Sequence, residues 1–257
     1  MYTKKDLLDG LRALGIGSTD TLLVHSSYKS LGEVEGGPDT VLDALSEAVT
    51  DGLLILPTHT WDKVKPGVPY DPANTVSCNG ILTEMFRKRP GVVRSLHPTH
   101  SVAALGKHAA EYTAGEENAH TPAPRNGCWG RLYDEDAWLL FLGCGIRYNT
   151  FLHSVEEWED IPDRLSEPKL IDTVMPDGSV YTRTYQSHSS SFGDVSATFG
   201  KLELPLLQKK FLRFGYIGDA PSFLMRARDV ADLTVAYLRK DPNFFGKWDQ
   251  VPNEWFR

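Results

Sequence analysis

A histidine and two carboxylates stand close together in the segment NTFLHSVEE, residues 149–157. If a helix begins at Thr150, His153 precedes Glu156 by three residues and Glu157 by four, so the three side chains lie on neighbouring faces of one helix. A carboxylate one turn away fixes the tautomer of an imidazole and supports the charge that the ring acquires when it takes a proton. This spacing is typical of a general base, and an ion pair on a helix face is the alternative interpretation.

Acidic residues continue beyond this segment, and five fall within eight positions: Glu156, Glu157, Glu159, Asp160 and Asp163. The whole chain has 27 Lys plus Arg against 34 Asp plus Glu, a net charge of −7. The local cluster therefore favours a cationic substrate more directly than the net charge does, although acids near a helix start are also explained by the helix dipole. The acidic balance argues against a polyanionic partner such as nucleic acid.

The loop after the apolar run 21–25 is a second candidate site. It contains small hydroxyl residues and glycines, and it leads into a helix that Pro38 begins: Ser26, Ser27, Gly32, Gly36 and Gly37. Backbone amides of such a loop, with the dipole of the following helix, can hold a phosphate or pyrophosphate. The loop has neither the GK[ST] of a Walker motif nor the spacing GxGxxG. A plain connection between a strand and a helix is therefore the alternative.

The remaining histidines suggest a metal site only weakly: His25, His59, His97, His100, His108, His120 and His188. No HExxH or HxH signature is present, and the GxSxG elbow of a serine hydrolase is also missing from the sequence. We therefore expect no metal. A metal-dependent hydrolase built from His97, His100, His153 and His188 is kept as an alternative.

The composition is that of one globular domain, with 257 residues, 41% hydrophobic and 24% charged. The longest apolar runs, at 53–57 and 137–142, are too short to cross a bilayer, and the N-terminus does not resemble a signal peptide. Three scattered cysteines suggest neither a disulfide framework nor a zinc knuckle: Cys78, Cys128 and Cys144. We expect a cytoplasmic protein, without a membrane partner, that forms a single domain over residues 1–257.

Buried strands and amphipathic helices alternate along the chain. Apolar runs predict strands at 21–25 and 52–57, joined by a helix from Pro38, which is a βαβ unit with a parallel pair. Further elements are predicted as a buried strand at 137–143, a β-hairpin with strands 170–174 and 180–185, and helices over 206–214 and 221–239. The fold class expected is α/β, a three-layer-like single domain with a mostly parallel central sheet, a β-hairpin and helices toward the C-terminus.

Four blocks of the sequence resemble, in order, the aminoglycoside 3-N-acetyltransferase family, over about residues 3–245. They are LVHSS at 23–27 with Leu31-Gly32 and Gly36-Gly37-Pro38; RSLHP at 94–98 with AALG at 103–106; TFLHSVE at 150–156; and Gly218-Asp219-Ala220. The resemblance implies an α/β fold unrelated to the common GNAT acetyltransferases, acetyl-CoA as the donor and an aminoglycoside as the cationic acceptor.

The resemblance also implies roles for single residues. Coenzyme A would contact the first loop and two further positions: Ser26, Ser27, Tyr28, Lys29, Leu31, Gly32, Ser95 and Val102. His153 and Glu156 correspond to the catalytic histidine and glutamate of the family. His188 stands where some members carry an Asp-His pair, and here Ser187 replaces the aspartate.

These residues together predict acetyl transfer to the 3-amino group of an aminoglycoside. His153 would take a proton from the amine, Glu156 would orient the imidazole, and His188 would lie in reach of the same site. Glu157 and Asp160 would bind the polycation, and loop amides around Ser26 and Ser27 would stabilise the oxyanion. A different small amine as acceptor is an alternative, while a non-catalytic binding protein is disfavoured because both His153 and Glu156 are present.

Overall fold

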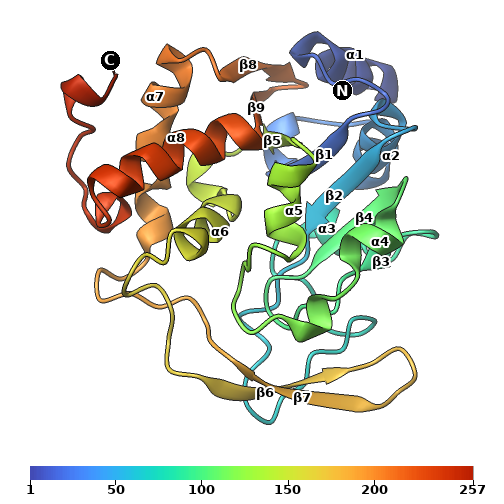
Figure 1. Ribbon diagram of the computed structural model, residues 1–257. Helices are drawn as coiled ribbons and strands as arrows, with labels where there is room; N and C mark the ends of the chain where they lie inside the picture. Colours follow the sequence, from blue (N-terminus) through green and yellow to red (C-terminus); the bar gives the residue numbers. More distant parts are fainter. Residues whose placement is uncertain (257) are drawn as a thin grey trace.

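A seven-stranded sheet separates two layers of helices (Figure 1). The computed structural model describes residues 1–256. The strand order is β3-β4-β2-β1-β5-β9-β8. The bounds are β1 Thr21–Ser26, β2 Leu53–Pro57, β3 Val93–Arg94, β4 Val102–Gly106, β5 Trp138–Leu142, β8 Leu212–Ile217 and β9 Ala220–Arg226. A separate hairpin pairs β6 (Lys169–Val174) with β7 (Val180–Tyr185).

The centre of the sheet is parallel and its two flanks are antiparallel. Strand β1 pairs in parallel with β2 and with β5, so that Leu23 lies opposite both Ile55 and Leu139. Every pairing outside these three strands is antiparallel. On one side β4 pairs with β2 and with β3, and on the other side β9 pairs with β5 and with β8. Five strands (β3, β2, β1, β5 and β8) therefore run in one direction. The predicted βαβ unit is confirmed as β1, α2 and β2.

Helices cover both faces of this sheet, which confirms the predicted three-layer α/β class (Figure 1). One layer holds α1 (Lys4–Leu14), α2 (Pro38–Ala48) and α3 (Ile81–Phe86). The other holds α4 (Ala109–Thr113), α5 (Cys128–Asp134), α6 (Phe151–Trp158), α7 (Glu203–Gln208) and α8 (Ala227–Lys240). Side chains of β1 alternate between the layers, since Leu22 and Val24 pack toward α1 and α2 while Leu23 packs toward the other layer.

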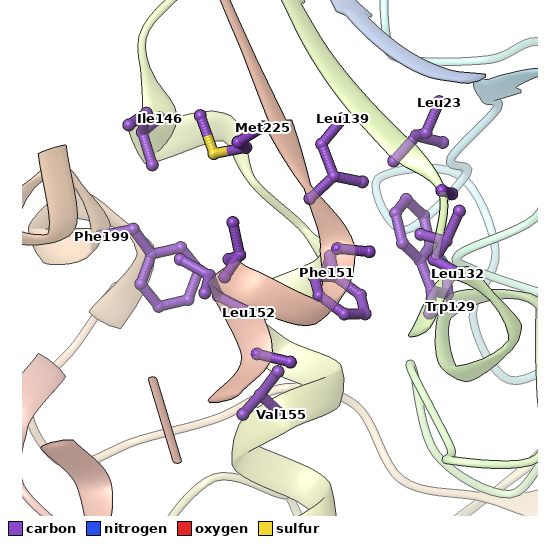
Figure 2. Close-up of a cluster of buried hydrophobic side chains, with 14 of the residues drawn as sticks. Leu23, Trp129, Leu132, Leu139, Ile146, Phe151, Leu152, Val155, Phe199 and Met225 are labelled. Carbon is purple, nitrogen blue, oxygen red and sulfur yellow. The ribbon is translucent and has the colours of Figure 1, made fainter. Parts of the chain in front are cut away.

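Helix α6 is fixed by its apolar face. Phe151, Leu152 and Val155 are fully buried in the cluster that also contains Trp129 and Phe199 (Figure 2). Because residues three and four positions apart share a helix face, this anchoring determines where the polar residues between them point. The orientation of His153 and Glu156 therefore follows from the packing of α6 against the core.

Two helix predictions in the C-terminal part are wrong. The helix expected over 206–214 ends as α7 at Gln208, and strand β8 begins at Leu212. The helix expected over 221–239 begins only at Ala227, because Ala220–Arg226 forms β9. Strand β9 pairs with β5, whose backbone would otherwise form an unpaired edge of the sheet. Leu224 fitted the helical period of α8, although it lies in this strand and faces the opposite layer.

The hairpin β6–β7 is confirmed, and it extends away from the main sheet (Figure 1). Its turn closes where Met175 donates its amide to the Ser179 carbonyl, and Gly178 has φ +83°. Tyr70 ties the irregular segment 58–79 to β6, since its amide donates to the carbonyl of Asp172. Among the helices that the structure describes, none combines the length and apolar character that a membrane crossing requires.

Candidate active site

A cavity of about 1140 Å³ opens at the carboxyl ends of the three parallel strands. Its wall includes His25 and Ser27 at the end of β1, His59 beyond β2, and Gly143 directly after β5. Helix α6, the base of the hairpin and the segment 187–199 complete the wall. Carboxyl ends of parallel strands are where open α/β sheets bind ligands, so this cavity is the candidate active site.

His153 lies on this wall and contacts a buried carboxylate. Its Nδ1 is 3.2 Å from Oε2 of Glu156, and its side chain is 14% exposed. The other oxygen of Glu156, Oε1, accepts from Nε of Arg164 at 2.5 Å. Both Glu156 and Arg164 are buried, at 1% and 4% exposure. The carboxylate is therefore held between a cation and the imidazole, which leaves Nε2 of His153 for the cavity.

His188 stacks on His153, with ring centroids 3.9 Å apart and an interplanar angle of 28°. Its position is fixed by an isolated bridge to Leu165 and by the Ser189 amide, which donates to the Arg164 carbonyl. Burial and the neighbouring histidines hold the pKa of His188 well below its usual value. The predicted convergence of His188 and His153 is thus observed, and His188 is neutral at neutral pH.

Further histidines continue from His188 into the interior. His100 contacts His188 edge-on at 5.0 Å, and His59 contacts His100 at 4.7 Å, both between ring centroids. Burial lowers the pKa of His25 and of His97 to about 3. His97, His100, His153 and His188 therefore gather as suggested for the hydrolase alternative. Within residues 1–256, however, no three His, Cys, Asp or Glu side chains have an arrangement that could hold a metal ion.

Ser26 and Ser27 line the cavity, but the backbone of Ser27 is already engaged. Its amide donates to the Leu142 carbonyl at 2.8 Å, and its hydroxyl accepts from Ser30 at 2.8 Å. The expectation that the Ser27 amide faces an oxyanion is therefore wrong. Sequence reasoning missed this because the bond joins the loop to β5, which is distant along the chain.

The other residues assigned to coenzyme A do not line the cavity: Tyr28, Lys29, Leu31, Gly32, Ser95 and Val102. Three of them are buried within the fold, and Ser95 and Val102 are hydrogen-bonded to each other. Leu31 belongs to the apolar cluster beneath α1 and α2, and a Cβ on Gly32 would meet Asp219. Leu31, Ser95 and Val102 are thus packed in the interior, and their contact with coenzyme A stays a prediction.

The acids that follow Glu156 are directed away from the cavity. Glu157 accepts from the Thr121 hydroxyl at 2.6 Å and from the Ala123 amide at 2.9 Å, and with Asp160 it lines a second, smaller cavity. Burial raises the pKa of Glu157 to about 7. Glu159 pairs with Arg239, and Asp163 accepts from Ser190 and Ser191. Glu157 and Asp160 therefore lie outside the large cavity, and their contact with a substrate stays a prediction.

Several wall residues were not singled out by the sequence. Arg164 and Asn149 carry no motif of their own, although Asn149 directly precedes the TFLH block. In the part of the chain that the structure describes, four basic residues line the wall: Lys65, Arg147, Arg164 and Lys169. One acidic residue, Asp194, lines it as well. The wall is thus basic, whereas the sequence predicted an acidic one.

An α/β fold with a histidine–carboxylate pair on a large cavity has the general layout of an enzyme active site. The model of the family "Aminoglycoside 3-N-acetyltransferase" matches residues 23–239, and this chain belongs to that family of acyltransferases. The resemblance in the sequence is therefore confirmed.

Relatives match over nearly the whole chain. Aminoglycoside N(3)-acetyltransferase VII of Streptomyces paromomycinus is 31% identical, covering 93% of this chain and 92% of its own. Aminoglycoside N(3)-acetyltransferase III of a Salmonella species is 30% identical, covering 98% and 96%.

Two solved structures share the fold. AAC-IIIb, in a binary complex with CoASH, superposes with a TM-score of 0.81 at 27% identity, covering 93% of this chain and 97% of its own. A histidine-to-alanine mutant of the aminoglycoside acetyltransferase AAC(3)-IVa, in complex with a gentamicin, has a TM-score of 0.82 at 27% identity, covering 98% and 93%.

Proposed function

We propose that this protein transfers the acetyl group of acetyl-CoA to the 3-amino group of an aminoglycoside, with His153 as the general base. The observation that carries the proposal is the array His153–Glu156–Arg164, which is buried on one side and opens on the large cavity on the other. The acceptor and donor are supported by relatives, since one solved structure contains CoASH and another contains a gentamicin.

The first step at His153 is the removal of a proton from the acceptor amine. An amine of an aminoglycoside is mostly protonated at neutral pH and cannot attack a thioester in that form. Because Nδ1 of His153 faces Glu156, Nε2 takes the proton from the amine. The amine nitrogen then forms a bond to the acetyl carbon, the C–S bond breaks, and the electron pair of that bond goes to sulfur. Nε2 has by then released the ammonium proton to solvent, and it takes the second proton of the nitrogen as the N–C bond forms. That second proton passes from Nε2 to the departing thiolate, which restores neutral His153 and leaves a neutral amide.

The neighbours of His153 serve the charged state of its ring. Glu156 stabilises the imidazolium and fixes the tautomer that leaves Nε2 unprotonated. Arg164 holds Glu156 in place and balances its charge, because both side chains are buried. His188 stays neutral and stacks on the ring, so it restricts the rotation of His153 without competing for the proton.

Replacing the base tests the proposal. His153→Ala removes general-base catalysis, and we expect kcat/KM to fall by about 10²–10⁴-fold in an assay of thiol release from acetyl-CoA. His108→Ala is the matched control, because His108 is exposed and does not line the cavity. Both variants should show the far-UV circular dichroism of the wild type. Turnover of His153→Ala near the wild-type rate rejects the role of this residue.

A second candidate acceptor is a small amine other than an aminoglycoside, and the basic wall favours it. Lys65, Arg147 and Lys169 repel a polycation, and within residues 1–256 Asp194 is the acid on the wall. The same three cations can instead meet the phosphates of coenzyme A, which keeps the aminoglycoside compatible with the cavity.

A substrate panel separates the two acceptors. It compares aminoglycosides of the kanamycin, gentamicin, apramycin and paromomycin types with small amines that carry a phosphate or phosphonate group, each assayed for thiol release. The highest kcat/KM with an aminoglycoside supports the first acceptor. The highest value with an anionic amine supports the second acceptor and leaves the role of His153 as base intact.

A further inference from the structure

Buried polar atoms without a hydrogen-bond partner are concentrated on the wall of the candidate active site. Among the described residues, four that line the cavity carry such atoms: His25, His59, Asn149 and His188. An unpartnered buried polar group destabilises a fold, and native proteins contain few of them. A concentration at one cavity therefore indicates groups that a ligand satisfies when it binds.

Asn149 is exceptional within this set because both ends of its amide are unpartnered. The residue has 0% exposure, and neither Nδ2 nor Oδ1 has a partner. Its backbone, in contrast, is fixed on both sides, since its amide donates to the Ile146 carbonyl and its carbonyl accepts from the Leu152 amide. A rigid backbone thus presents an amide group at the wall, directly before the helix that carries His153.

Acetyl transfer requires a donor at this wall. When the amine attacks, negative charge develops on the acetyl oxygen, and a preorganised donor stabilises that charge. The Ser27 amide is bonded to Leu142 and cannot serve. His59 also has a free Nε2, but His100 and His188 separate its ring from His153 in the series of ring contacts.

We propose that Asn149 is a further catalytic residue, whose Nδ2 donates a hydrogen bond to the acetyl oxygen of the donor thioester as its charge develops. The inference rests on the proposed acetyl transfer from acetyl-CoA. Asn149 transfers no proton in this step: the oxygen becomes negative as the N–C bond forms, and it returns to a carbonyl as the C–S bond breaks. The proton moves through His153 alone.

Two substitutions remove the donor and keep the number and branching of the side-chain heavy atoms. Asn149→Asp replaces the amide NH₂ with an oxygen, and Asn149→Leu replaces the polar group with methyl groups. We expect kcat to fall by about 10²–10³-fold in both variants, with KM for acetyl-CoA changed by less than about threefold. Because Asn149→Leu also removes an unsatisfied group, its Tm should equal or exceed that of the wild type.

Asn79→Leu is the matched control for stability. Asn79 also lines the cavity, but its Oδ1 accepts from the His59 amide at 2.5 Å. Replacing Asn79 with leucine leaves the His59 amide without its hydrogen-bond acceptor, so Tm should fall. A purely structural role of Asn149 predicts the same fall for Asn149→Leu, and a fall in Tm of equal size would overturn the proposal. So would a kcat of either variant within threefold of the wild type.

A spectroscopic measurement separates this inference from the choice of acceptor. The infrared carbonyl band of ¹³C-labelled acetyl-CoA, bound without any amine, should move to higher wavenumber in Asn149→Leu than in the wild type. An unchanged band overturns the role of Asn149 alone. A shifted band with no transfer to any aminoglycoside supports Asn149 and rejects that acceptor. If calorimetry shows that the wild type does not bind acetyl-CoA, both proposals fail.

Discussion

Two adjacent glutamates on different faces of helix α6 have different partners. Glu156 faces the cavity side and is shared by two cationic or basic partners, His153 and Arg164. Glu157 faces the loop 121–123 and accepts from a hydroxyl and a backbone amide. Both carboxylates are largely withdrawn from water, but only Glu156 has a cation in contact.

This contrast separates Glu156, whose carboxylate supports the proposed base, from Glu157, whose carboxylate holds the loop 121–123. Burial without a cation raises the pKa of Glu157 to about 7, so its charge is costly at neutral pH. Glu156 has Arg164 beside it, and its charge can stabilise the imidazolium of His153. The neighbouring cation, rather than burial, therefore distinguishes the two carboxylates. Substitutions at Arg164, Glu157 and Asp160, and a double variant that includes Glu156, test this distinction.

The largest effect is expected at Arg164. Arg164→Met leaves Glu156 buried without its cation, and removal of one partner of a buried ion pair costs about 3–5 kcal/mol of unfolding free energy. The measurement is urea denaturation followed by circular dichroism. Arg239→Met is the matched control, because it breaks the pair with Glu159, the residue directly after α6, while its own side chain is 70% exposed. That exposed pair should be worth less than about 1 kcal/mol.

A double variant shows whether the loss of unfolding free energy in Arg164→Met comes from the unpaired charge of Glu156. Glu156→Gln combined with Arg164→Met removes both charges, so most of the lost stability should return, because no unpaired charge remains buried. Activity should stay at least about tenfold below the wild type, since a neutral Gln supports the imidazolium poorly. Equal stability of wild type and Arg164→Met contradicts the structural role of this pair.

An intermediate effect is expected at Glu157, and it depends on pH. The carboxyl has a pKa of about 7 in the folded state against 4.5 when unperturbed, so its protonated form favours folding. This contribution is fully present below about pH 4.5 and is lost as pH rises through 7. We expect Glu157→Gln to be more stable than the wild type by about 1–3 kcal/mol at pH 8, and nearly equal at pH 4.5.

Thermal or urea denaturation at several pH values checks this expectation. Glu116, which is also buried with a pKa raised to about 7, acts in the same direction, so Glu157→Gln reduces the pH dependence without abolishing it. Glu167→Gln is the control, because Glu167 is exposed. Parallel pH profiles for the wild type and Glu157→Gln would show that the Glu157 carboxyl is ionised without cost.

Sequence patterns identified the elements that depend on local signals. Thr3 and Asp6 form a capping box at the start of α1, a pairing that their spacing of three residues indicates, and Gly178 supplies the positive φ of the expected hairpin turn. Strand β9 escaped prediction because its existence depends on the free edge of β5, about eighty residues earlier in the chain. A short apolar run beside an amphipathic helix carries no signal that distinguishes a strand from an additional helical turn.

The site was predictable where it rests on one helix and unpredictable where it rests on contacts between segments. The pairing of His153 with Glu156 follows from a spacing of three residues. The approach of Arg164 to Glu156 and the stacking of His188 on His153 depend on the chain path after α6, which no periodicity encodes. For the same reason the acids after Glu156 form one cluster in the sequence but contact different parts of the fold. Glu157 contacts the loop 121–123, Glu159 contacts Arg239, and Asp163 contacts Ser190 and Ser191.

The smallest effect is expected at Asp160, which lies two residues beyond the end of α6 and lines the smaller cavity. Asp160 lies outside the main cavity and has φ +49°, a conformation that asparagine tolerates well, so Asp160→Asn removes the charge without straining the backbone. Steady-state kinetics should show KM for an aminoglycoside within about twofold of the wild type, and only a shallow rise of KM with salt, because charges beyond about 10 Å are screened. Asp194→Asn provides the comparison, since Asp194 lines the cavity. A tenfold rise of KM in Asp160→Asn alone would place the polycation against the outer face of α6 and reverse the assignment of the two faces.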